Sequence, residues 1–154
     1  MKENSMFSDV VESFDGWVLK YTLSHQKPFY WKVDGEHNIF IRRKFKHWKP
    51  EKVSADVLYR LNDYMANGSW KYLANNVQKL GNGTEIEGLG SFLYRINPDT
   101  SFAQLSSHLG AIFTNADVWE CNKSERKMKF RLSDNKWEDK INQYYSIGSC
   151  HLLC

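Results

Sequence analysis

The first third of the chain alternates apolar and polar residues with a period of two. The segment GWVLKYTLS (16–24) places an apolar side chain at every second position, which is the pattern of a strand with one buried face. Two further runs, FYWKV (29–33) and NIFIRRKF (38–45), flank the sequence DGEHN. An Asp-Gly pair between such runs is typical of a hairpin turn, because Gly35 accepts a positive φ. These residues predict a three-stranded antiparallel meander.

Farther along the chain, the apolar positions recur at the helical spacing of three and four. Ser54 is expected to cap a first helix, which ends at Asn67. Ser69 is expected to cap a second helix, which Gly81 closes. The glycine-rich stretch 81–90 is expected to be a loop that contains a short strand.

The remaining pattern predicts two more helices, a hairpin and a last helix. Residues 91–96 favour a short helix, and the Asn-Pro-Asp turn that follows leads to Thr100, the expected cap of a longer helix. The stretch 117–132 divides into two strands around a polar turn, with one wet, basic face. Residues 135–145 favour a C-terminal helix.

Together these elements predict an α+β protein. An N-terminal three-stranded antiparallel meander is followed by a helical region that ends in a β-hairpin, and by a C-terminal helix. The length of 154 residues is typical of one domain, so we expect residues 1–154 to form a single compact unit. A sub-division into a β-meander (1–50) and a helical part (51–154) is compatible with the pattern.

Composition places the chain among soluble globular proteins, with 42% hydrophobic and 25% charged residues. No window approaches the length of an apolar membrane span, and the N-terminal residues lack the pattern of a signal peptide. Three cysteines, an odd number, suit a reducing compartment better than a disulfide framework. We therefore expect a cytoplasmic protein without membrane attachment.

The net charge is only +3, but the positive charges are concentrated in two basic clusters. The first basic cluster spans residues 42–52 and carries Arg42, Arg43, Lys44, Lys46, Lys49 and Lys52 against Glu51. The second basic cluster spans residues 123–131 and carries Lys123, Arg126, Lys127, Lys129 and Arg131 against Glu125. Lys and Arg grouped in this way are typical of phosphate contacts.

Two interpretations of the first basic cluster remain open. The charges at its start fall on both faces of a strand, which suits an edge strand that must avoid unwanted pairing. Trp48, however, stands between cations beyond that strand, and an exposed ring in this setting is typical of a surface that stacks nucleic-acid bases.

The order of elements over residues 69–133 resembles a generic winged helix-turn-helix domain, without pointing to a specific family. In such domains the second helix of the turn enters the DNA major groove and the hairpin wing lies along the backbone. The resemblance implies base-edge contacts from Gln104, Ser107 and His108. It also places Lys127, Lys129 and Arg131 on the wing. The alternative for this helix is a core helix with a neutral outer face.

No pattern of high specificity for catalysis or for a cofactor occurs in the chain. The sequence lacks G-x-S-x-G and the Lys-Ser/Thr of a phosphate loop. Cys121, Cys150, His151 and Cys154 are zinc-preferring residue types, but their spacing is not that of a standard zinc site. We predict neither a metal nor a cofactor, and a metal-dependent nuclease ranks third among the functions considered.

The sequence therefore predicts a non-enzymatic nucleic-acid-binding module, with DNA favoured over RNA. Phosphate contacts are assigned to Arg42, Arg43, Lys44, Lys46, Lys127, Lys129 and Arg131, stacking to Trp48, and base contacts to Gln104, Ser107 and His108. The alternative is a protein-interaction module, such as a small inhibitor or adaptor. Such a module would bind through an aromatic sheet face made of Trp17, Tyr30, Trp31 and Trp48. Convergence of Arg43, Lys46, Lys127 and Arg131 on one face would favour nucleic acid. The oligomeric state is not predicted.

Overall fold

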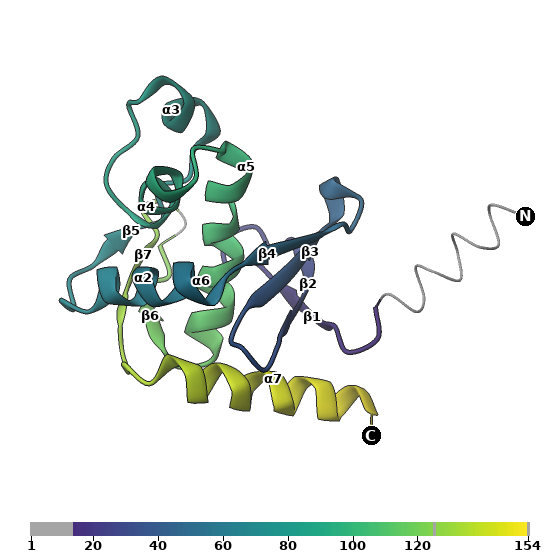
Figure 1. Ribbon diagram of the computed structural model, residues 1–154. Helices are drawn as coiled ribbons and strands as arrows, with labels where there is room; N and C mark the ends of the chain where they lie inside the picture. Colours follow the sequence, from purple (N-terminus) through teal and green to yellow (C-terminus); the bar gives the residue numbers. More distant parts are fainter. Residues whose placement is uncertain (1–13, 125, 154) are drawn as a thin grey trace, which may run out of the picture.

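The structure, a computed structural model, describes residues 14–124 and 126–153, with side chains as far as Ser149. The protein is α+β, as the sequence predicts (Figure 1). A four-stranded antiparallel sheet comes first, followed by several helices, a small second sheet and a C-terminal helix.

The N-terminal sheet has the strand order β1-β2-β3-β4. Its strands are β1 (Val18–Tyr21), β2 (Pro28–Val33), β3 (Ile39–Arg43) and β4 (Pro50–Val53). The predicted meander is confirmed, and β4 extends it. The sequence of β4, PEKV, shows no apolar alternation and so gives no sign of a strand. Because β3 pairs with β4 as well as with β2, β3 is not an edge strand, and the interpretation of Arg42, Arg43 and Lys44 as charges on an edge strand is wrong. The edge strands of this sheet are β1 and β4.

The hairpin between β2 and β3 forms at DGEHN, but through a different residue than expected. The Asp34 carboxylate accepts hydrogen bonds from the backbone N–H of Glu36, at 3.0 Å, and of Asn38, at 2.9 Å. The positive φ, +68°, belongs to His37 and not to Gly35. The Asp34 side chain therefore closes this turn, in the way that Asx turns do.

The helical part contains most of the predicted elements. Its helices are α2 (Ala55–Met65), α3 (Val77–Asn82), α4 (Leu89–Ile96), α5 (Thr100–Ala103), α6 (Leu105–Asn115) and α7 (Trp137–Leu153). The second sheet has the order β5-β7-β6, with β5 (Lys71–Tyr72), β6 (Trp119–Cys121) and β7 (Lys129–Leu132). Ser54 caps α2 as expected, and its hydroxyl accepts the Val57 N–H at 3.3 Å.

Two helix predictions need correction. The helix expected from Ser69 does not form, because residues 71–72 pair with β7 as β5, and only α3 remains of it. The longer helix expected after Thr100 is divided into α5 and α6. Its cap is Asp99, whose carboxylate accepts the Ser101 N–H at 2.9 Å. The short strand expected within 81–90 is absent from the described residues there, where Gly88 instead forms a single parallel bridge with Tyr72.

Helix α6 stands at the centre of the molecule, between the N-terminal sheet and the second sheet, while α7 crosses beneath both (Figure 1). The buried cluster takes Trp31 and Ile41 from the first sheet, Leu109 from α6, and Trp119 and Phe130 from the second sheet. Contacts with β1, α4, β6 and α7 surround α6, so most of its length is buried.

Candidate functional site

Two adjoining hollows lie beside the N-terminal turn of α6. The inner cavity, of about 630 Å³, lies between the loop after β1, the end of β3 and the start of α6. The outer groove, of about 1000 Å³, lies between the loop around β5, the start of α3 and the tip of the β6–β7 hairpin. Ser24, His25, Asn75 and Ser107 line both hollows, so the two hollows adjoin, and the pair is called the depression below.

The inner cavity is lined by cationic and hydrogen-bonding side chains. Lys27, Arg43 and Lys44 contribute positive charge, and the described lining residues include no Asp or Glu. Phe45, in the short η1 helix (Lys44–Lys46), forms an aromatic part of the wall and is 66% exposed. The cavity therefore suits an anionic or polar ligand that carries a flat ring.

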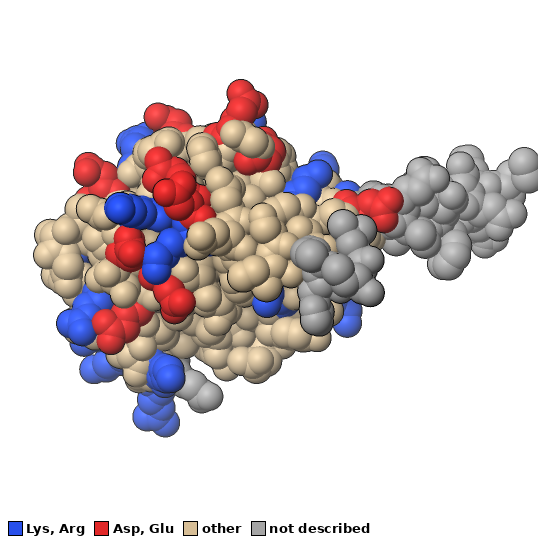
Figure 2. All heavy atoms as spheres, turned by 90° about the horizontal axis from the view of Figure 1, so that it is seen from below, with Lys and Arg blue, Asp and Glu red and all other residues tan. Residues whose placement is uncertain are grey.

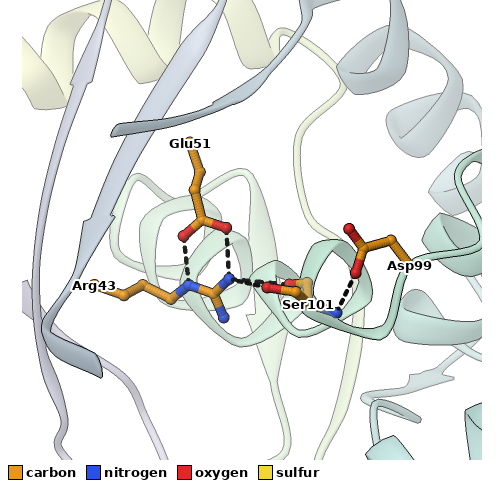
Figure 3. A network of polar contacts seen from close by, with 4 residues as sticks. All are labelled: Arg43, Glu51, Asp99 and Ser101. Atoms are coloured by element: carbon orange, nitrogen blue, oxygen red, sulfur yellow. Dashed lines mark hydrogen bonds and ion pairs between the residues drawn. The ribbon is translucent and has the colours of Figure 1, made fainter. Parts of the chain in front are cut away.

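Arg43, which lines the inner cavity, is held in a network of polar contacts with Glu51 and Ser101 (Figure 3). Its side chain is 2% exposed and pairs with Glu51, with Nε and Nη2 donating to the two carboxylate oxygens at 2.7 and 2.6 Å. Nη2 also donates to the Ser101 carbonyl, at 3.1 Å, and to the Ser101 hydroxyl, at 2.9 Å. Glu51 thus compensates the charge, and the network joins β3 and β4 to the start of α5. Arg43 is therefore buried and paired rather than an exposed cation, and its assignment to a phosphate contact stays a prediction.

One guanidinium nitrogen of Arg43 stays outside this network. Among the described residues, Nη1 has no hydrogen-bond partner, although it is buried. The Phe45 ring covers the guanidinium, with its centroid 4.9 Å from Cζ. A buried donor that lacks a partner costs free energy, so an acceptor that approached this nitrogen would be bound favourably.

His108 forms another part of the cavity wall and lies edge-on to Phe29, with 4.9 Å between the ring centroids. Burial, aided by the charges of Arg43 and Lys27 and opposed by the Gln104 carbonyl, lowers the pKa of His108 to about 3. The imidazole is therefore neutral near pH 7 and offers hydrogen bonds without charge.

The other two residues assigned to base contacts also line the inner cavity. Gln104 and Ser107 are half-buried at the first turn of α6. The Ser107 hydroxyl accepts a hydrogen bond from the Asn75 side-chain amide at 2.7 Å. The structure thus brings Gln104, Ser107 and His108 together with Arg43 and Lys44 around one cavity. Sequence spacing alone could not show that Arg43 and Lys44 lie beside α6.

The second basic cluster contributes unevenly to the outer groove. Arg126 and Lys127 are exposed and line it. Lys129 lies over the Tyr72 ring, 4.9 Å from its centroid. Arg131 lies over the Trp70 ring at 4.5 Å and pairs with Glu120 at 2.8 Å. Lys129 and Arg131 are outside the residues that line either hollow, and Glu120 compensates the charge of Arg131.

The rest of the first basic cluster lies away from the hollows. Arg42 points to the other face of the sheet, is 8% exposed, and lies over Phe14 and Trp17, 4.7 and 4.4 Å from their ring centroids. Trp48 is half-buried rather than exposed, because its ring packs on Tyr30 at 5.3 Å. Lys46 is half-buried as well. Of the four cations named for convergence, Arg43 and Lys127 line the depression and Lys46 and Arg131 do not.

The aromatic sheet face predicted for the alternative function is not an exposed surface in the structure. Trp31 is fully buried and stacks on Tyr144 of α7, on the core side of the sheet. Trp17 is 4% exposed. The outer face of the sheet instead exposes Leu19 and Tyr21, which are 39% and 48% exposed.

Several residues of the depression carry no signal in the sequence. Lys27 and His25 belong to the loop after β1, and Lys79 belongs to α3, so only the tertiary fold brings them to α6. Phe45 lies within the first basic cluster, yet its strand pattern gives no reason to place it beside a cavity.

The face of the molecule that Figure 2 shows carries no large area of positive charge alone. Lys and Arg side chains lie there among Asp and Glu side chains, beside a broad uncharged area (Figure 2). In the described parts of the chain, no helix has the length and apolar character needed to cross a membrane. The described side chains hold no group of three His, Cys, Asp or Glu residues that could bind a metal ion. The side chains of Cys150, His151 and Cys154, considered above with Cys121, lie outside that description.

No family model matches this chain, and neither do the curated proteins or the solved structures with which it was compared.

Proposed function

We propose that this protein is a non-enzymatic nucleic-acid-binding module, for DNA in preference to RNA, that holds its ligand in the depression beside α6. One observation carries the proposal. Lys44 of the first basic cluster and Lys127 of the second line one depression, together with Gln104, Ser107 and His108. Cations that follow a backbone and polar groups that reach base edges are the two components of nucleic-acid recognition.

The order of elements supports the same function. The chain runs α2, β5, α4, α6, β6 and β7, with α3 inserted after β5 and the short α5 inserted before α6, and the small sheet has the order β5-β7-β6. This order resembles a winged helix-turn-helix domain, with α2 in place of the helix expected at 69–80. In this interpretation α6 is the second helix of the turn and the β6–β7 hairpin is the wing, whose tip carries Arg126 and Lys127.

The proposal predicts binding that weakens steeply with salt. Five exposed cations line the depression for phosphate contact: Lys27, Lys44, Lys79, Arg126 and Lys127. Five contacts to a single strand should reduce affinity by about 100-fold between roughly 50 and 200 mM salt, because each contact releases counterions. Fluorescence anisotropy of labelled oligonucleotides at both salt concentrations measures this loss.

Two triple variants with the same change in net charge test whether nucleic acid binds in the depression. Lys27→Glu, Lys44→Glu and Lys127→Glu together should abolish binding at about 50 mM salt, since they reverse most of the charge in the depression. Lys52→Glu, Arg60→Glu and Lys136→Glu together change the net charge equally, at exposed positions outside both hollows, and should preserve most of the affinity. Absence of binding by the native protein, or equal losses in both triple variants, would refute the proposal.

The outer face of the N-terminal sheet favours the alternative, a protein-interaction module, since Leu19 and Tyr21 are exposed there. The double variant Leu19→Ser and Tyr21→Ser separates the two functions. Nucleic-acid binding through the depression should be unchanged in this variant, whereas a protein partner that uses this face would be lost.

A further inference from the structure

The recognition helix of a duplex-binding domain must protrude to enter the major groove. Helix α6 does not protrude, because Ser106 and every residue from His108 to Phe113 are buried. Strand β1 and helix α7 of this same chain pack against it. Apart from its last two residues, the open part of α6 is its first turn, with Gln104 and Ser107, and that turn borders a hollow.

The inner cavity has the size and wall of a pocket for one flat, polar ring. Its volume of about 630 Å³ lies within the range of ligand pockets in general, roughly 300–1,000 Å³. Phe45 offers an exposed aromatic face for stacking. The side-chain amides of Gln104 and Asn75 each present both a donor and an acceptor, the combination that reads a base edge.

The cavity wall contains two buried polar groups, Arg43 and His108, and one nitrogen of Arg43 lacks a hydrogen-bond partner in the described part of the chain. Arg43 is 98% buried, being 2% exposed, and its Nη1 has no partner among the described residues. The neutral imidazole of His108 lies in the same wall. A base carbonyl or a phosphate oxygen would satisfy the guanidinium nitrogen, whereas an apolar ligand would leave it unpaired.

The cations are arranged for a backbone that passes from one hollow to the other. Lys27 and Lys44 border the inner cavity, and Arg126, Lys127 and Lys79 border the outer groove, where Trp70 and Tyr72 add further rings. Glu85 and Glu87 also line the outer groove. The Glu87 carboxylate is paired with Arg95 at 2.8 Å, and the Glu85 carboxylate accepts the Asn76 N–H at 2.8 Å.

We infer that the protein binds single-stranded nucleic acid and seats one unpaired base in the inner cavity, against Phe45. The inference rests on the proposed function and specifies its ligand. An unpaired base can enter a hollow and present its whole edge, whereas a base within a duplex keeps its Watson–Crick edge occupied.

The first test compares a labelled single strand with the duplex of the same sequence, by fluorescence anisotropy at about 50 mM salt. We expect the single strand to bind more tightly. In Phe45→Ala its affinity should fall about fivefold or more, the loss typical of one stacked base. Phe45 is 66% exposed, so this change should leave the fold intact. The matched control, Tyr59→Ala, removes an aromatic ring that is 46% exposed on α2, outside both hollows, and should keep native affinity.

The second test locates the seated base. In a short oligonucleotide, each base in turn is replaced by an abasic unit. One position should cause the largest loss with the native protein, and this loss should be smaller in Phe45→Ala, because both changes remove the stacking contact between that base and Phe45.

The possible failures are distinguishable. Duplex binding as tight as single-strand binding would overturn the inference, and so would single-strand binding that Phe45→Ala leaves unchanged while Lys27→Glu, Lys44→Glu and Lys127→Glu abolish it. Either result would leave the proposed function standing. Binding of neither form would refute both.

Discussion

His108, on α6, lies between Phe29 of the N-terminal sheet and the inner cavity, in a setting that opposes its protonation. Burial is the largest cause, and the positive charges of Arg43 and Lys27 act in the same direction. With the pKa lowered to about 3, the native protein binds fewer protons than the unfolded chain between that pH and about 6.5, the ordinary value for histidine. The contribution of His108 to stability is therefore fully present above about pH 6.5 and is lost as the pH falls below it.

We predict that protonation of His108 in the unfolded chain lowers the free energy of unfolding as the pH is reduced. The loss should be about 1.4 kcal/mol for each pH unit between roughly pH 6 and 4.5. Carboxylates whose pKa is lowered in the native state, such as Asp34 and Glu87, lose their contribution only as the pH falls below about 4. Urea unfolding at several pH values measures the slope, and His108→Gln should flatten it. A variant that keeps the native slope would show that another group is responsible.

For Arg43, the sequence predicts the face of the strand on which the side chain lies but not the residues with which it pairs. Alternation along 38–45 correctly predicts that Arg43 shares a strand face with Ile39 and Ile41. The identity of its partners depends on Glu51, in a strand without a recognisable pattern, and on Ser101, 58 residues away along the chain. A charged residue on a core-facing position is therefore better interpreted as a buried ion pair than as a surface contact.

In the segment 69–80, the local pattern predicts a helix, whereas the tertiary structure forms strand β5. Trp70, Leu73, Val77 and Leu80 recur at helical spacing. Pairing of Lys71 and Tyr72 with β7 nevertheless outweighs that preference, and the Leu73 N–H continues the contact by donating to the Met128 carbonyl at 3.0 Å. Helix propensity is a weak preference that tertiary contacts override, so sequence could predict α2, α4 and α7 but not β5.

Close backbone approach explains two of the glycines after α3. A Cβ on Gly88 would lie 2.2 Å from the Tyr72 carbonyl oxygen, and one on Gly90 would lie 2.3 Å from the Ala74 carbonyl oxygen. We predict that Gly88→Ala and Gly90→Ala each destabilise the protein by about 1–3 kcal/mol or more, because backbone must move to make room. Thermal or urea unfolding measures the loss.

Gly81 provides the control for these substitutions. It lies within α3, where a Cβ would meet no atom within 4 Å. Gly81→Ala should therefore be neutral or stabilise by up to about 1 kcal/mol, as expected for alanine in a helix. Unchanged stability in Gly88→Ala would show that the segment shifts without cost and that the close approach to β5 is not required.

For the whole molecule, the buried cluster around α6 decides how the protein unfolds. The cluster combines residues of the N-terminal sheet with residues of α6, α7 and the second sheet. The Arg43 network adds a polar link between the first sheet and α5. Separating the two parts would expose apolar residues of α6 and leave Arg43 without Ser101, so neither part has a complete core alone.

We therefore predict that the sheet and the helices unfold in one cooperative transition. Ile41→Ala, a change in the fully buried centre of the N-terminal sheet, should cost about 2–5 kcal/mol. It should lower the urea midpoint of the far-UV circular dichroism signal of the helices as much as that of tryptophan fluorescence, because coincident probes indicate a two-state transition. Leu19→Ala, on the exposed outer face of the same sheet, should shift neither midpoint much. If the helical signal of Ile41→Ala kept its native midpoint while fluorescence changed earlier, the sheet would be an independent unit, and the wall of the inner cavity could open without unfolding α6.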